Sequence, residues 1–194
     1  MNLKNLLFAS VIVLSANASF AQDTKVAAHS LTINIPQSAL LDLEVETGTT
    51  DVTLAGTAPK EAGLPMTFED ATAKNATIWM NYSSIVKGVL LRKVTVAITN
   101  GTVPTGLKLT VLASAASSDG KGTLGAASTA LTLTGTGQDI VTGIGSTYTG
   151  DGANKGRSLT YQLGYATDAA TDYAALRYVD TAAPLTITYT LSDI

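Results

Sequence analysis

The segment APLTITYTLSDI, residues 183–194, decides the fold class. In it Leu185, Ile187, Tyr189 and Leu191 alternate with threonine or serine. Successive side chains of a β-strand point to opposite faces, so these four side chains would share one buried face. The segment therefore predicts a strand that either finishes the core of a closed β-domain or walls a groove for another chain.

The same alternation recurs along the chain, between stretches rich in Gly, Pro and Asn, whereas no long segment has the 3.6-residue period of a helix. It predicts further strands within residues 30–35, 40–46, 51–55, 77–83, 92–99, 106–113, 130–135, 158–165 and 174–179. Alternation of this kind is typical of antiparallel sheets with one face buried. We predict an all-β fold, an antiparallel immunoglobulin-like β-sandwich of eight to ten short strands, in preference to a barrel.

Two stretches break the pattern. Residues 113–129 are small and polar, which predicts a flexible loop or a ragged sheet edge. Residues 143–156 read as a Gly-rich loop that carries one aromatic side chain, Tyr148. The pair Asn100-Gly101 is a strong signal for a β-hairpin turn.

The first 21 residues have the features of a secretory signal peptide. Lys4 precedes an apolar run from Leu6 to Leu14, and the small residues Ser19 and Ala21 suit cleavage after position 21. The run is shorter than the roughly 20 residues that span a bilayer, and no later stretch reaches that length. We expect a signal peptide over residues 1–21 and one exported domain over 22–194, in the periplasm, at the cell surface or outside the cell. No transmembrane span is expected after signal removal.

The composition argues against most catalytic chemistry. The chain has no cysteine and a single histidine, His29, so thiol catalysis, a multi-histidine zinc site and a Ser-His-Asp triad lack their residues. The net charge is −3 and no basic patch is evident, which disfavours nucleic acid as a partner. We predict no catalytic, cofactor-binding or metal-binding residues, and a protein that is not an enzyme.

The only organised carboxylates, Asp42, Glu44 and Glu46, alternate along one predicted strand. Charges on an open face discourage edge-to-edge aggregation of sheets, which is the preferred interpretation. A weak calcium site is the alternative.

Two aromatic side chains are candidate ligand contacts. Tyr148 lies in the predicted Gly-rich loop, where recognition residues tend to gather, and Trp79 faces away from the apolar side of its predicted strand. Trp79 and the seven tyrosines could form a platform on which a sugar ring stacks, but most of the tyrosines occupy apolar-face strand positions, which favours core packing, and Tyr148 is the exception.

The segments LTINIP (31–36), LLDLEVE (40–46) and PLTITYTLSDI (184–194), with the short signal and the cysteine-free Thr-, Ala- and Gly-rich chain, resemble bacterial fimbrial subunits and related surface β-sandwich proteins. In chaperone-usher fimbriae each subunit lacks one strand, which an N-terminal extension of the next subunit supplies. The resemblance implies a strand-exchange segment with Leu31, Ile33 and Ile35 as inserted side chains. It implies that Leu185, Ile187, Tyr189 and Leu191 border the receiving groove.

Two functions follow as expectations. The first is an exported structural surface protein, a fimbria or filament subunit that joins copies of itself or a related subunit by β-strand addition. The second is a cell-surface or secreted adhesin module that binds surface glycans without catalytic activity.

Overall fold

The computed structural model describes residues 25–69, 71–178 and 184–194. The predicted signal peptide, residues 1–21, lies outside the described residues and stays a prediction. The chain divides into two units, residues 1–34 and residues 35–194, which are described separately. The second unit is called the body below.

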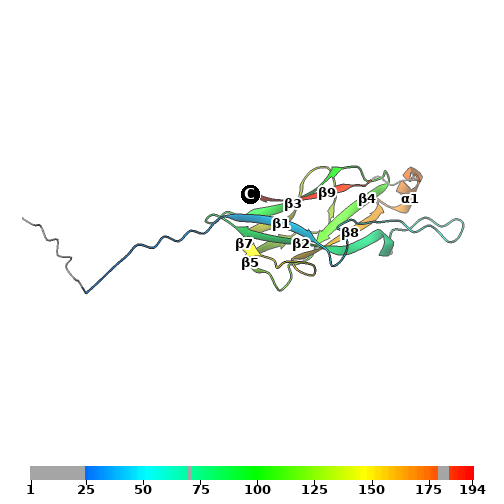
Figure 1. The fold of residues 1–194 in the computed structure, drawn as a ribbon. Coiled ribbons are helices and arrows are strands. Elements are labelled where there is room, and N and C mark those ends of the chain that lie inside the picture. The colour runs from blue at the N-terminus through cyan, green and yellow to red at the C-terminus, as the bar shows by residue number, and fades with distance from the viewer. Residues whose placement is uncertain (1–24, 70, 179–183) are drawn as a thin grey trace, which may run out of the picture. The chain divides into compact units, whose positions relative to one another are not determined.

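The described part of the body is built mainly of strands, with only short helical turns (Figure 1). The strands are β1 (Ser38–Glu44), β2 (Lys74–Ile85), β3 (Arg92–Asn100), β4 (Leu107–Ala113), β5 (Lys121–Ala127), β6 (Leu131–Thr132), β7 (Gln138–Tyr148), β8 (Arg157–Tyr165) and β9 (Thr186–Asp193). The helical turns are η1 (Ala71–Ala73), α1 (Ala169–Asp172) and η2 (Tyr173–Ala175). The prediction of an all-β protein is confirmed.

Every strand pair in the body is antiparallel. Hydrogen bonds link the strands in the order β6-β4-β8-β2-β7-β3-β9, and β1 pairs with β2 while β5 pairs with β7. The immunoglobulin-like topology remains a prediction.

The sheet must fold over on itself to make the core. Val111 on β4 and Val94 on β3 are both fully buried in one cluster, although four strand spacings separate them in the sheet order. In a flat sheet that separation would be about 19 Å, too far for two valines to share a core. The cluster also takes in buried side chains from β2, β7 and β8, so the folded sheet encloses a single core.

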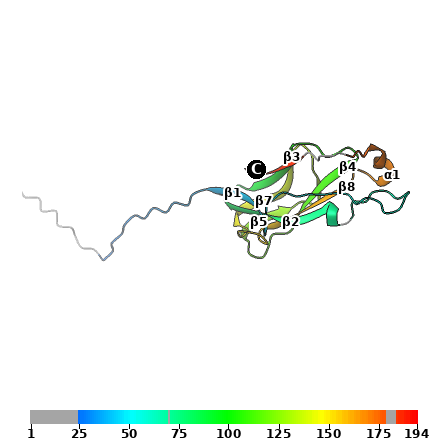
Figure 2. The same cartoon turned by 45° about the vertical axis from the view of Figure 1, so that its right-hand side comes forward.

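Because the strands are antiparallel, each connection between them lies at one of two ends of the body. At one end, the turn end, β2 turns into β3, β1 begins and β9 finishes, with the Ile194 amide donating to the Leu91 carbonyl. At the opposite end, the loop end, lie α1 and the long connection between β1 and β2 (Figures 1 and 2). The Tyr165 hydroxyl anchors that connection by donating to the Met66 carbonyl at 2.7 Å.

Four of the strongest alternating segments are strands, as predicted: residues 77–83, 92–99, 106–113 and 158–165 lie within or largely within β2, β3, β4 and β8. Ile78, Met80 and Tyr82 all point into the core from β2, in keeping with the two-residue period.

The prediction of a Gly-rich loop over residues 143–156 is wrong in its first part, because β7 runs to Tyr148. The sequence pattern does not predict β7, because bulges break the alternation of its side chains. Ile140 and Val141 are consecutive and both buried, and the pairing register with β3 shifts next to Val94. Residues 121–127, expected in a loop or ragged edge, form the edge strand β5.

Other local predictions are wrong in instructive ways. Residues 51–55 form no strand. Of the strand predicted over residues 174–179, the described part, residues 174–178, forms none, since η2 covers Tyr173–Ala175 and no strand follows it. Asn100-Gly101 does form a turn, with Gly101 at φ 79°, but no hairpin. β3 pairs with β7 and β9, whereas β4 pairs with β6 and β8, so the turn carries the chain across the core.

Candidate functional site

The candidate site is the gap between β1 and β9, which run in opposite directions along one side of the body. Within the described residues β1 pairs only with β2, and β9 only with β3. Each strand therefore keeps one edge whose backbone N–H and C=O groups have no ladder partner.

An open groove of about 370 Å³ separates the two strands. Leu41 and Leu43 line it from β1, and Ile187 and Tyr189 line it from β9. The remaining lining residues are polar: Asp42, Thr50 and Thr188. An apolar slot between two strand edges is the kind of surface to which an added strand binds.

The core is incompletely covered on this side. Leu185, Ile187, Tyr189 and Leu191 pack against the core, but all four are only partly buried. On the neighbouring strands β3 and β2, Val94, Val96 and Met80 are fully buried. The apolar side chains of β1 and β9 thus alternate along their strands as core residues do, but they remain partly exposed.

Two tyrosine hydroxyls meet beside the groove. The Tyr161 hydroxyl on β8 and the Tyr189 hydroxyl on β9 are 2.7 Å apart and share a hydrogen bond. Burial raises the pKa of both phenols above the usual value. The pair stays neutral at ordinary pH, and it ties β9 to a strand with which β9 has no ladder.

A buried arginine bridges the groove at the turn end. Arg92 Nε donates to Asp193 Oδ1 on β9 at 2.7 Å, and Arg92 Nη1 donates to the Ser38 carbonyl on β1. Nη1 also donates to Ser84 Oγ at 3.1 Å. The bridge therefore joins β1 to β9 across the groove at the turn end.

The predicted strand-exchange residues lie in an extended segment without regular secondary structure, residues 25–37, called the arm below. Leu31, Ile33 and Ile35 are exposed to 77, 78 and 74 %. Large aliphatic side chains exposed on alternate positions form the pattern of a strand that lacks a partner.

The two candidate ligand-contact aromatics do not come together. Tyr148 is the last residue of β7 and is exposed, paired with Ser83 on β2. Trp79 is half-buried on β2, between Glu44 and Ser158. Trp79 and Ser83 are four residue steps apart on β2, about 13 Å along the strand, so the two rings do not form one stacking platform.

The alternating carboxylates are spread over β1 and the loop that follows it. Glu46 accepts a hydrogen bond from Asn154 Nδ2 at 3.0 Å. In the parts of the chain that the structure describes, no three His, Cys, Asp or Glu side chains gather as a metal site would require. Nothing in this arrangement favours the calcium alternative over a solvated face.

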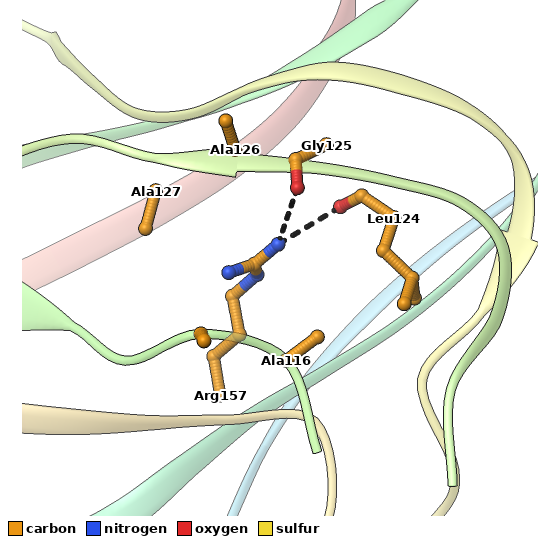
Figure 3. Close-up of a pocket in the computed structure, with 7 residues that line it drawn as sticks. Ala116, Leu124, Gly125, Ala126, Ala127 and Arg157 are labelled. Atoms are coloured by element: carbon orange, nitrogen blue, oxygen red, sulfur yellow. Dashed lines mark hydrogen bonds between the residues drawn. The ribbon is translucent and has the colours of Figure 1, made fainter. Parts of the chain in front are cut away.

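A second, open depression of about 470 Å³ lies beside β5, and no pattern in the sequence predicts it (Figure 3). Arg157 lies in it with only 2 % of its surface exposed, and Nη2 donates to the carbonyls of Leu124 and Gly125 at 3.0 and 2.7 Å. Nη1 and Nε donate to the Ser114 carbonyl and the Tyr82 hydroxyl. Arg157 thus covers carbonyls of the edge strand β5 and holds that strand against β8.

No protein family, curated protein or solved structure matches the chain. Among the residues that the structure describes, no helix is both long and apolar enough to cross a bilayer.

Proposed function

We propose that this chain is an exported structural protein that assembles into filaments by β-strand addition. In this proposal the body is an immunoglobulin-like sandwich that lacks one strand, and the arm of a second copy is inserted between β1 and β9. Parts of these two strands lie within 8 Å of each other, Cα to Cα, so they must move apart to admit a strand that needs about 5 Å on either side. The observation that carries the proposal is the groove itself, with two unpaired strand edges and a lining in which apolar side chains of β1 and β9 alternate with polar ones.

The arm suits the groove chemically. Its exposed aliphatic side chains, two residues apart, would point into the slot, while Thr32 and Asn34 would face outward. Its backbone would pair with the free edges of β1 and β9, and its side chains would cover their half-buried leucine, isoleucine and tyrosine.

The covalent link between arm and body favours exchange between copies. To lie antiparallel beside β1 of its own chain, the arm would need a tight hairpin at Pro36-Gln37. Two-residue hairpins use turns with positive φ at the first position, and the proline ring fixes φ near −65°. Pro36 therefore opposes the fold-back and leaves the aliphatic side chains for another copy.

The test is a pair of matched substitutions in the exported chain. Ile33→Asp places a charge on an inserted side chain, and Thr32→Asp places the same charge on the opposite face of the arm. By size-exclusion chromatography with light scattering, we expect Ile33→Asp to stay monomeric and Thr32→Asp to assemble like the wild type. Assembly of Ile33→Asp at wild-type concentrations would refute strand addition.

Cross-linking tests the site directly, because the chain contains no cysteine. We expect Ile33→Cys combined with Ile187→Cys to give disulfide-linked oligomers. Ile33→Cys combined with Leu112→Cys, which places the second thiol on the exposed face of β4, is the matched control and should give none.

The glycan-binding alternative depends on Tyr148, the one of the two candidate ligand-contact aromatics that is exposed. It predicts that Tyr148→Ala abolishes binding to an immobilised glycan panel while folding is retained. Binding that is absent in the wild type, or unchanged by the substitution, would remove that alternative.

A further inference from the structure

The turn end of the body carries an exposed apolar surface, called the apolar tip below. Val89, Leu90 and Leu91 form the turn between β2 and β3 and are exposed to 96, 51 and 41 %. Ile194 is exposed next to Leu91, whose carbonyl accepts its amide hydrogen bond, and Ile85 is exposed at the end of β2.

The tip is too apolar to be an ordinary turn. Turns at sheet ends are usually built from Gly, Asn, Asp and other polar residues, and only Gly88 and Lys87 fit that description here. Adjacent exposed aliphatic side chains of this kind mark an interaction surface. The described residues of the body offer no cover for them.

The short tether to the arm identifies what covers the tip. Ser38 begins β1 at the turn end, paired with Ile85, and only Pro36 and Gln37 separate it from Ile35. Three residue steps span at most about 11 Å when fully extended. A copy that receives Ile35 in its groove must therefore lie directly against the donor's turn end.

The Arg92 bridge selects which end of the receiving copy is involved. That bridge joins β1 to β9 at the turn end, so in the proposed assembly an inserted arm would leave the groove at the loop end. The loop end has exposed apolar side chains of its own: Leu64 in the connection between β1 and β2, and Tyr173 and Tyr178 near α1.

We infer that the apolar tip of one copy packs against the loop end of the copy that receives its arm, as a second, axial contact between subunits. The inference rests on the proposed strand addition and adds a surface to it. The contact is heterologous, with different surfaces on the two copies, so repetition gives an open filament instead of a closed dimer.

The first test uses the full exported chain with Val89→Ser and Leu90→Ser together. These side chains are exposed in the monomer, so the melting temperature of the monomer should not change. The critical concentration for assembly should rise by about tenfold or more, because two aliphatic side chains lose their burial. Leu112→Ser, an exposed leucine on β4 with 41 % exposure like Leu91, is the matched control and should leave assembly unchanged.

The two proposals fail in distinguishable ways. If Val89→Ser/Leu90→Ser assembles at the wild-type critical concentration while Ile33→Asp does not assemble, the axial contact is wrong and strand addition stands. If Ile33→Asp assembles normally, strand addition is wrong and the axial contact is refuted with it.

A second test identifies the partner surface. Val89→Cys combined with Leu64→Cys should give intermolecular disulfides, and Val89→Cys combined with Leu112→Cys should not. The Val89→Cys single variant shows whether two tips meet. If it forms disulfide dimers as readily as the Val89→Cys/Leu64→Cys variant forms its intermolecular disulfides, the contact is tip to tip, and the inference is overturned. Tip variants that assemble normally but no longer bind phosphatidylcholine–phosphatidylglycerol vesicles would show a membrane-facing tip, which also overturns it.

Discussion

At the scale of single residues, the most consequential side chain is Arg157. It is buried, it takes part in none of the ion pairs found among the described residues, and its donors go to three backbone carbonyls and the Tyr82 hydroxyl. A buried cation is tolerated when its hydrogen bonds are satisfied, and its loss leaves buried acceptors without donors.

We therefore expect Arg157→Met, which keeps much of the side-chain volume, to lower the free energy of unfolding by about 3 kcal/mol or more. The free energy of unfolding is measured by urea denaturation, with tyrosine and tryptophan fluorescence as the signal. Lys155→Met, which removes an exposed ion pair with Asp119, is the control and should leave the midpoint nearly unchanged. Equal midpoints for the two variants would contradict the role given to Arg157.

The pair of Tyr161 and Tyr189 predicts how stability depends on alkaline pH. Burial holds the pKa of both phenols above 10, whereas in the unfolded chain they ionise near 10. The stabilisation is complete below pH 10 and is lost as the pH rises above it, since the unfolded chain then releases protons that the folded chain retains.

Tyr189→Phe removes one of these titrations. Above pH 10 the free energy of unfolding should fall less steeply in this variant, by about 1.4 kcal/mol per pH unit. Urea midpoints at pH 8 and pH 11 give the comparison. An alkaline slope equal to that of the wild type would mean that Tyr189 ionises as readily when folded as when unfolded.

At the scale of strands, the sequence predicted those elements whose two-residue period is unbroken. β2, β3, β4, β8 and β9 could be located because each buries alternate side chains. β7 could not, since its bulges and its left-handed glycine, Gly143 at φ 73°, switch which side chains face inward. Turn signals predict where the chain reverses but not which strands pair. The hairpin predicted at Asn100-Gly101 therefore does not form, because the strands on either side of the turn pair with other strands.

The arm shows a second limit of pattern reading. Residues 30–35 alternate as well as any strand in the body, yet they form none. Alternation states which face of a strand would be buried, and it contains no information on which chain supplies the partner. The sequence pattern predicts that the groove residues of β9 share one buried face. That one edge of β9 has no paired strand among the described residues could be recognised only in the structure.

The edges of β1 and β9 lead to a prediction for amide exchange. An edge strand pairs only every other residue with its neighbour, so alternate amides of both strands face the empty groove. In the monomeric Ile33→Asp variant these amides should exchange rapidly with deuterium, while those of β3 are protected. A peptide of residues 25–37 should protect them. Uniform protection of β1 and β9 in the monomer would contradict an open groove.

At the scale of the whole molecule, the body has no disulfide to compensate for the incomplete cover of its core, because the chain has no cysteine. Its stability comes from one core that is well covered on most sides and poorly covered between β1 and β9. Occupation of the groove should therefore stabilise the whole body.

We expect the peptide of residues 25–37, at about 100 times its dissociation constant, to stabilise the Ile33→Asp variant by about 2.7 kcal/mol. For a domain of this size that corresponds to a rise of about 5–10 °C in melting temperature by calorimetry. The same peptide with Ile33→Asp is the control and should cause no rise. Equal shifts with both peptides would show that the effect does not depend on inserted side chains.

The groove has one wall from β1, the first strand of the body in chain order, and the other from β9, the last. During synthesis these two walls are made furthest apart in time among the described strands. A chain that has emerged only as far as β8 already contains most of the core but lacks one wall of the groove. In the proposed assembly, a molecule could therefore receive a neighbour only after β9 has folded, and products truncated after β8 would be left out.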